Sequence, residues 1–247
     1  MVNGVREPRG AAARAFSAGE EALLRGAGRP KEWPAGAVVL VEGGPPEGVV
    51  LIHEGLVKTT ADTPGGYTSL LAVRGPGELV GELSCLDRRP RSATVMAVRP
   101  VRGTVIAADR FLRLLEQHDA LALSLVRSIT GRLRASDRLR ADQGALPAQA
   151  RVARVLLDLA LHHGAGVPRA PGARVVALSQ SEVASASGTS RESVVRALRQ
   201  LQRDGVVSTA RGRITVHDLR ALAHWTDPPG ARTPHRRPGA PAGRCHR

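Results

Sequence analysis

Residues 77–94 read Gly-Glu-Leu-Val-Gly-Glu-Leu-Ser-Cys-Leu-Asp-Arg-Arg-Pro-Arg-Ser-Ala-Thr. The glycines let backbone N–H groups approach an anion closely, and a short helix opening at Glu82 would attract negative charge to its first N–H groups. Arg91 adds a fork of donors that suits a phosphate, with the Ser92 hydroxyl beside it. Glu82 adds an acceptor for a sugar hydroxyl. Together these groups predict a site for a nucleotide that carries a single phosphate.

Two parts of this stretch resemble the phosphate-binding cassette of cyclic-nucleotide-binding domains, in particular that of the Crp/Fnr family of bacterial transcription regulators. They are Gly81-Glu82-Leu83 and Pro90-Arg91-Ser92-Ala93-Thr94. The resemblance implies that the backbone of Gly81 and Leu83 holds the cyclic phosphate together with Arg91 and Ser92, and that Glu82 holds the ribose. The alternative is an ordinary turn in which Arg91 is a solvated rim residue paired with Glu82.

The nucleotide base would lie between apolar residues of this domain and polar residues of a later helix. We expect Leu71, Val73 and Val80 to line the base pocket, and the resemblance places Ser136 and Asp137 against the purine. Members of the family often carry two hydroxyl residues at these two positions, so Asp137 departs from the pattern. The expected effector is cAMP, and the departure leaves cGMP, another ligand or no ligand open.

Composition limits the class of protein. The 247 residues allow one large or two modest domains, and an apolar fraction of 42% is enough for a core. A formal charge of +14 favours a polyanionic partner, either nucleic acid or an anionic membrane. The two cysteines form no disulfide framework and no Cys-x-x-Cys metal site. No Walker motif, nucleophile elbow, zinc-ligand spacing or membrane-spanning apolar run is present, so we expect a cytoplasmic protein that is not an enzyme and needs no metal.

Residues 33–106 have the pattern of an antiparallel β domain. Short Val/Leu/Ile runs at 38–41, 49–52, 56–58, 67–73, 94–98 and 102–106 alternate with Gly/Pro turns. Such even spacing predicts a β-sandwich or β-roll. Ser17 begins a helix before it, with Glu20 three residues later as a capping box.

A long helix is expected from about Asp119 to Arg140. Leu125, Ile129 and Leu133 lie on one narrow, heptad-like stripe of this helix, which also includes Leu121. A stripe this narrow favours a partner helix, and the resemblance implies a dimer through it. The alternative is that the helix packs on its own β-roll.

Residues 179–201 read as two helices joined by a tight turn. Ser179 can cap the first helix, with Glu182 three residues on, and Ser190 can cap the second. Between them Ser187-Gly188-Thr189 supplies a glycine turn. This arrangement predicts a helix-turn-helix, and the segments at 205–208 and 212–216 predict a small hairpin wing.

The second helix begins with Ser190-Arg191-Glu192-Ser193-Val194-Val195-Arg196, which resembles the family's reading head. Arginine can bond guanine bidentately and glutamate can accept from cytosine. The resemblance therefore implies that Arg191 and Arg196 contact guanines and Glu192 a cytosine, in a half-site of the TGTGA type. The full set of expected DNA contacts is Ser179, Gln180, Ser190, Arg191, Glu192, Ser193, Arg196 and Arg199. The alternative is that Arg191 and Glu192 neutralise each other on a solvated face.

The order of the segments predicts an α+β protein: an N-terminal cyclic-nucleotide-binding β-roll, a long dimerisation helix and a C-terminal winged helix-turn-helix. Expected boundaries are 1–16 for a disordered lead-in, 17–118 for the β-roll, 119–141 for the helix, 142–147 for a hinge, 148–226 for the DNA-binding domain and 227–247 for a disordered basic tail.

The resemblance implies a homodimeric transcription regulator on a palindromic double-stranded operator, with RNA polymerase as a further candidate partner. The competing class is a regulatory subunit that binds cyclic nucleotide and controls an enzyme. The helix-turn-helix argues against that class.

Overall fold

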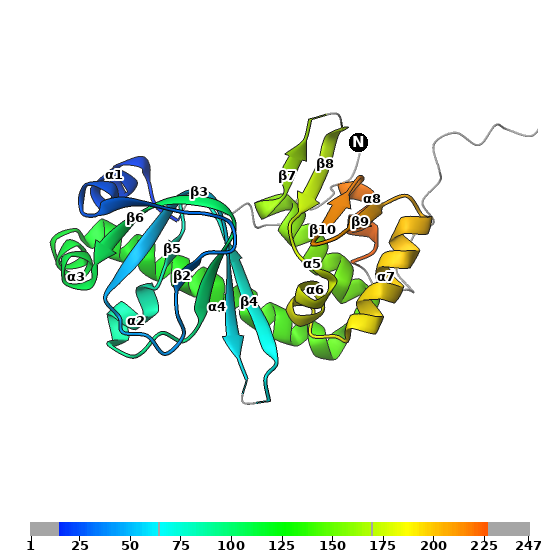
Figure 1. The fold of residues 1–247 in the computed structure, drawn as a ribbon, viewed down its shortest axis with the longest axis horizontal. Helices are drawn as coiled ribbons and strands as arrows, with labels where there is room; N and C mark the ends of the chain where they lie inside the picture. The colour runs from blue at the N-terminus through cyan, green and yellow to red at the C-terminus, as the bar shows by residue number, and fades with distance from the viewer. Residues whose placement is uncertain (1–14, 64, 169, 227–247) are drawn as a thin grey trace, which may run out of the picture.

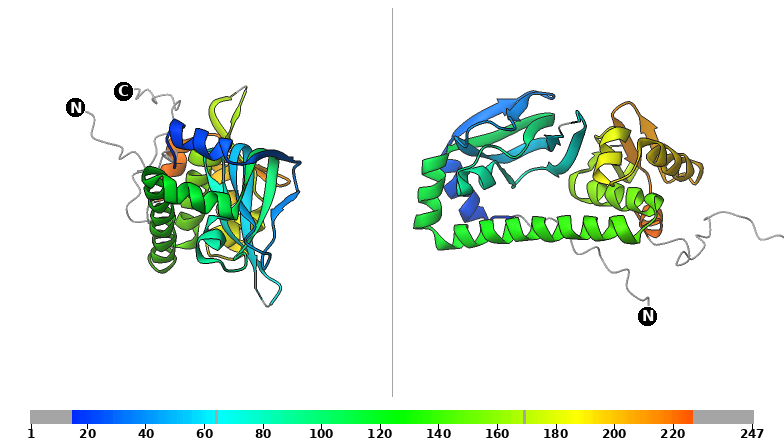
Figure 2. Two further views of the ribbon diagram at one scale, coloured as in Figure 1. Left: turned by 90° about the vertical axis from the view of Figure 1, so that its left-hand side faces the viewer. Right: turned by 90° about the horizontal axis from the view of Figure 1, so that it is seen from below.

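The computed structural model describes residues 15–63, 65–168 and 170–226, which form two domains joined by one long helix (Figure 1). Seen from below, this helix runs along one side of the molecule from the N-terminal to the C-terminal domain (Figure 2). The expected lead-in up to Arg14 and the expected tail from Asp227, with Cys245, lie outside the described residues. The expected lead-in of residues 1–16 extends too far, because Phe16 is 2% exposed and packs in the N-terminal core.

The N-terminal domain is built on an antiparallel sheet. Its strands are β1 (Arg29–Trp33), β2 (Val38–Leu40), β3 (Gly48–Asp62), β4 (Thr68–Arg74), β5 (Leu79–Val80) and β6 (Thr94–Ala107). They follow the order β1-β6-β3-β4, with β2 also paired to β6 and β5 to β3, so β4 is an edge strand. The predicted β-roll is confirmed, and β1 is a strand that was not predicted from the sequence.

Strands β3 and β6 are each one long strand where the sequence predicted two. They pair from Gly48↔Ala107 to Thr60↔Thr94, with register shifts between Ile52 and Val57 that bend the ribbon. Gly55 lies at the bend with φ 95°, and a Cβ there would stand 2.2 Å from the carbonyl oxygen of Pro100. Only glycine fits this backbone and this approach.

Three short helices cover the roll: α1 (Ala18–Gly26), α2 (Glu82–Asp87) and α3 (Ala108–Gln117). The predicted capping box of α1 is present, since Glu20 N donates to Ser17 Oγ and Ser17 N donates to Glu20 Oε2. Leu24 and Phe111 are fully buried in one core cluster with Phe16, Leu51 and Ile106.

The long helix α4 (Asp119–Ala145) turns most of the stripe expected to form a dimer seam toward its own domain. Leu125 is 2% exposed and belongs to the N-terminal core with Leu121, and Ile129 packs against the same cluster. Leu133 is 57% exposed. Assigning Leu125 to the seam was therefore wrong, because that side chain already fills the core of its own domain.

The predicted hinge at 142–147 is mostly helix. Helix α4 continues to Ala145, and the break consists of Leu146 and Pro147, both with extended backbone. Proline has no N–H for a helical bond and fixes φ, which ends one helix and allows the next to begin.

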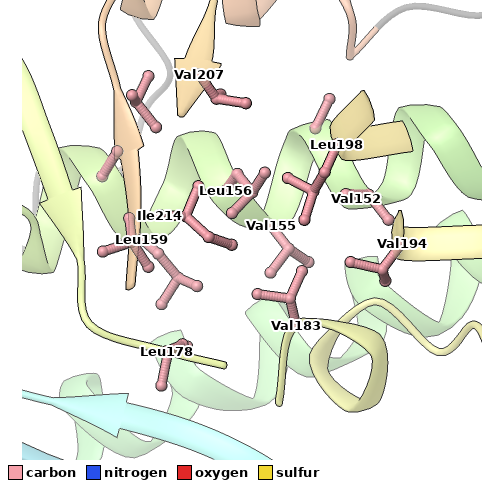
Figure 3. Packing of buried hydrophobic residues seen from close by; sticks show 14 of the residues in the cluster. Val152, Val155, Leu156, Leu159, Leu178, Val183, Val194, Leu198, Val207 and Ile214 are labelled. Atoms are coloured by element: carbon pink, nitrogen blue, oxygen red, sulfur yellow. The ribbon is translucent and has the colours of Figure 1, made fainter. Parts of the chain in front are cut away.

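The C-terminal domain has four helices among its described residues: α5 (Ala148–His163), α6 (Gln180–Ala186), α7 (Arg191–Arg203) and α8 (Leu219–His224). Strands β7 (Ala165–Val167), β8 (Ala170–Val176), β9 (Val207–Ala210) and β10 (Arg213–Val216) form a sheet in the order β7-β8-β10-β9. Its core joins Val152, Leu156, Val194, Leu198 and Ile214 (Figure 3). The winged helix-turn-helix is confirmed, while β7 and α8 were not expected.

The two domains share apolar contacts. Leu56 of β3 and Leu70 and Val73 of β4 belong to the same buried cluster as the core of the C-terminal domain. Within the described ranges, no helix combines the length and apolar composition needed to cross a bilayer.

Candidate functional site

The cassette is organised around the start of α2. Gly81 precedes the helix with φ 86°, and no side chain caps the first N–H groups. A Cβ on Gly81 would lie 2.7 Å from Arg91 Nη1 and 2.8 Å from Leu40 Cδ1, so glycine is needed for space as well as for φ. Arg88, with φ 55°, ends the helix and turns the chain toward Arg91.

Arg91 is buried, with 6% of its surface exposed. Its Nη1 donates to the carbonyl oxygen of Gly81 at 2.6 Å, and its Nη2 donates to that of Gly48 at 2.5 Å. These bonds hold the start of α2 to the start of β3, and the guanidinium keeps further N–H donors for an anion. The alternative of a solvated rim arginine is wrong.

The Sγ of Cys85 lies 4.0 Å from Arg91 Nη1. Burial raises the pKa of this thiol, with the neighbouring Arg91 acting in the opposite direction. The net effect keeps the thiol protonated, and Cys85 serves as a small buried filler of the cassette.

Glu82 is paired with Arg132, which was not predicted to be a site residue. Glu82 is 2% exposed, and Arg132 of α4 donates Nη1 to Oε1 and Nη2 to the carbonyl oxygen of Leu79, the latter at 3.0 Å. The second carboxylate oxygen, Oε2, is left as an acceptor. Arg132 follows Leu125 by seven residues and therefore lies on the same helix face, which is the signal that could have identified it.

The expected lining of a base pocket is only partly brought together. Leu71, expected in the base pocket, is 54% exposed. Leu83 and Ser92, expected at the phosphate, are exposed as well, Leu83 by 49%. Val80 is buried within the β-roll core. Val73 was assigned wrongly, because it packs into the core shared with the C-terminal domain.

On α4, Ser136 is half-buried and Asp137 is exposed. Asp137 forms an ion pair with Arg140 at 3.5 Å, so its carboxylate faces a cation of its own helix. Burial first, and then Arg132, lowers the pKa of Arg74, which pairs with Glu78 at 3.5 Å close to the cassette. The region around Glu82 thus balances arginines against carboxylates.

The two helices of the helix-turn-helix begin with side-chain caps. Ser179 accepts from Glu182 N while Glu182 Oε2 accepts from Ser179 N at 2.7 Å, which is the predicted capping box. Ser190 caps α7 by accepting from Ser193 N at 3.2 Å. Ser179, Ser190 and Ser193 therefore shape the helix starts. Gln180, in the first turn of α6, is half-buried.

The outer face of α7 carries the charged residues that the sequence selected. Arg191, Glu192, Arg196 and Arg199 are exposed and, with Val195, line one shallow concave surface. No ion pair joins Arg191 to Glu192, both of which are described, so the alternative of mutual neutralisation finds no support. Gln202 Nε2 bonds Thr209 Oγ1 at 3.1 Å and ties α7 to the wing, whose exposed Arg211 and Arg213 were not selected from the sequence.

Two family models match the chain. The cyclic nucleotide-binding domain matches residues 30–118, and the Crp-like helix-turn-helix domain matches residues 150–225. The first match contains the cassette and the second contains α6, α7 and the wing.

Individual relatives extend over most of the chain. A CRP-like cAMP-activated global transcriptional regulator of Mycobacterium tuberculosis is 30% identical over 197 residues, which cover 79% of this chain and 87% of the relative. The cyclic AMP receptor protein of Thermus thermophilus is 32% identical over 191 residues, covering 77% and 84%. A solved CRP-family regulator from Thermus thermophilus superposes with a TM-score of 0.66 at 26% identity, covering 79% and 96%.

The Glu82–Arg132 pair gives a stability prediction. Arg132→Met should lower the free energy of unfolding by about 2–4 kcal/mol, because it leaves a buried carboxylate unpaired. Glu82→Gln combined with Arg132→Met should lose much less than the sum of the two single changes. Urea denaturation of the four proteins measures this double-mutant cycle, and additive losses would contradict a direct pair.

Proposed function

The chain belongs to the Crp/Fnr family of transcription regulators, and we propose that it is a homodimer whose binding to a palindromic DNA operator is controlled by cAMP. The observation that carries the proposal is the cassette, in which a buried guanidinium and a buried carboxylate meet at the uncapped start of α2. The exposed charged face of α7 supports the DNA-binding half.

The free hydrogen-bond donors and acceptors of the cassette match those of a nucleotide with a cyclic phosphate. Arg91 uses one donor for Gly81 and one for Gly48, so its fork retains N–H groups for phosphate oxygens. Glu82 Oε2 can accept from a ribose hydroxyl while Arg132 holds Oε1. The names of two relatives at 30% and 32% identity state cAMP, which supports this nucleotide over others.

A second candidate is a regulator of the same family with another effector. Asp137, placed by the resemblance near the base, is a carboxylate and pairs with Arg140. A carboxylate at that place would favour a ligand edge rich in hydrogen-bond donors over one rich in acceptors.

The proposed dimer uses the face of α4 that its own domain leaves uncovered. Leu123, Val126 and Leu133 are exposed by 49%, 54% and 57%. With the exposed Thr130 they follow a spacing of three and four residues, which is the pattern of a helix–helix seam. This set replaces Leu125 and Ile129 and keeps Leu133 from the stripe expected from the sequence.

The cassette assignment predicts a loss of nucleotide binding in Arg91→Ala. Affinity for cAMP should fall by about 1.5–3 kcal/mol, because a charge-assisted bond to the phosphate is removed. Arg89→Ala removes the same charge from an exposed position in the same loop and is the matched control. Calorimetric titration with cAMP and cGMP measures both, with thermal melting to confirm folding. Equal binding by the two variants would rule out the phosphate role of Arg91.

The exposed charged face of α7 predicts that changing a residue that contacts a base affects DNA binding differently from changing one that contacts phosphate. Glu192→Ala should lose about 1–3 kcal/mol of discrimination at one base pair per half-site and retain nonspecific binding. Arg203 is exposed near the end of α7. If it contacts phosphate, Arg203→Ala should weaken binding to all DNA sequences alike and reduce the salt dependence of the affinity by about one counterion. Binding-site selection at two salt concentrations distinguishes them. Selection of the same site with the same stringency by wild type and Glu192→Ala would refute base reading by Glu192.

The seam predicts that Leu133→Asp weakens dimerisation by more than about tenfold, because a charge would be buried between two apolar helices. Leu161→Asp, which changes a leucine of α5 that is 42% exposed, is the control and should remain dimeric. Sedimentation velocity at several concentrations reports the association state. A wild-type protein that stays monomeric at micromolar concentration would exclude the seam.

A further inference from the structure

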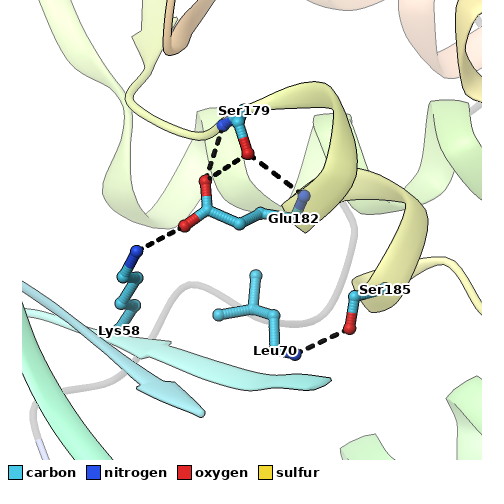
Figure 4. Close-up of polar contacts among 5 residues, drawn as sticks. All are labelled: Lys58, Leu70, Ser179, Glu182 and Ser185. Atoms are coloured by element: carbon cyan, nitrogen blue, oxygen red, sulfur yellow. Dashed lines mark hydrogen bonds and ion pairs between the residues drawn. The ribbon is translucent and has the colours of Figure 1, made fainter. Parts of the chain in front are cut away.

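The N-terminal domain reaches the helix-turn-helix through a lysine. Lys58 Nζ of β3 lies 2.6 Å from Glu182 Oε1 in the first turn of α6, and both side chains are about three-quarters covered, with 25% and 23% exposed (Figure 4). The other oxygen of that carboxylate, Oε2, accepts from Ser179 N and Oγ at 2.7 Å each. One oxygen of Glu182 therefore caps α6 and the other binds the opposite domain.

A second contact holds the far end of α6. Strand β4 is an edge strand, so N–H groups on its outer side have no strand to pair with. Leu70 N donates across the domain boundary to Ser185 Oγ at 2.6 Å (Figure 4). Glu182 and Ser185 are three residues apart on one face of α6, so the helix is held by its first and its last turn.

A β-bulge in β4 lets side chains of this strand face two different surroundings, the C-terminal core and the proposed nucleotide site. The register passes from Thr59↔Ala72 to Thr60↔Leu70, so Leu71 is the extra residue. Leu70 and Val73, three apart, consequently both face the C-terminal core, with 7% and 5% exposed. Leu71 is 54% exposed and belongs to the proposed nucleotide site.

We propose that Lys58, Leu70, Glu182 and Ser185 form an interdomain latch that fixes the orientation of the helix-turn-helix on the β-roll, and that the closed latch favours DNA binding. The proposal rests on the proposed function for its DNA-binding part. The existence of the latch can be tested without either ligand or DNA.

Two observations give the direction of the effect. With the latch closed, the charged face of α7 remains exposed, so the contact does not cover the reading surface. In helix-turn-helix complexes the first helix crosses the DNA backbone, and an uncompensated carboxylate in its first turn would repel phosphates. Burial acts to raise the pKa of Glu182, but the bonds from Lys58 and Ser179 outweigh it and lower that pKa. The carboxylate therefore stays charged, and Lys58 compensates it.

The chain offers a matched pair of variants for the affinity test. Lys31 and Lys58 are its only lysines, and Lys31 is exposed on β1 over the ring of Trp33. Lys58→Met should weaken operator binding about two- to tenfold, and Lys31→Met, which removes the same charge, should leave it unchanged. Fluorescence anisotropy on one operator fragment measures both. Equal affinities of the two variants would overturn the favourable role of the latch.

The Leu70 amide reports latch closure directly. Its exchange with deuterium, followed by NMR without nucleotide or DNA, should be faster in Lys58→Met and in Ser185→Ala than in wild type and Lys31→Met. Unchanged exchange in the first two variants would show that the contacts do not act as a unit. A wild-type protein that binds no operator would refute the proposed function, while the exchange rates would still decide whether the latch exists.

A double change separates orientation from charge compensation. Glu182→Gln retains the capping-box bonds with Ser179 and removes the charge that Lys58→Met would leave unpaired. Lys58→Met with Glu182→Gln should remain weaker than wild type in DNA binding, because the bond between Lys58 and residue 182 that helps orient the helix-turn-helix is lost. Full recovery of wild-type affinity would overturn the orienting role and reduce Lys58 to a counter-charge.

Discussion

The buried ion pair between Glu82 and Arg132 is the interaction on which the rest of the arrangement depends. It joins the first residue of α2 to the long helix, and Arg132 also bonds the carbonyl oxygen of Leu79 in β5. A carboxylate buried to this degree requires a partner, since a lone charge in the interior is strongly unfavourable. The cassette and α4 are therefore coupled by necessity, and a ligand that binds Glu82 acts on a residue of the helix that leads to the other domain.

Helix α4 divides its surface among different neighbours. One stripe, with Leu121 and Leu125, completes the core of the β-roll, and Arg132 continues that stripe toward the cassette. Another stripe, with Val126 and Leu133, is left uncovered. Near its C-terminal end, Asp142 pairs with Arg154 of α5 at 2.6 Å, so the helix also contacts the DNA-binding domain. A helix with so many separate contacts can transmit a change at one of them as a shift of the whole rod.

Local chemistry made much of the fold and site predictable from sequence. The caps at Ser17, Ser179 and Ser190 follow from side chains that bond nearby N–H groups, and the cassette and helix-turn-helix follow from short contiguous motifs. The face taken by Leu125 was not predictable, because heptad and core-facing stripes nearly coincide over three turns. Val73 was misplaced because a single inserted residue in β4 changes which side every later residue faces. Arg132 and Lys58 act across long sequence separations, which no local pattern encodes.

The short break between α4 and α5 has a consequence for the DNA that the protein can accept. Leu146 and Pro147 alone separate the two helices, and two residues span about 7 Å at full extension. A joint this short does not let the DNA-binding domain extend far from the helix end. In a dimer, the separation of the two recognition surfaces would then be set by helix geometry rather than by a flexible tether. An operator with extra base pairs between its halves would bind only if the DNA twists or bends, so the deformation energy would come from the DNA and not from the protein.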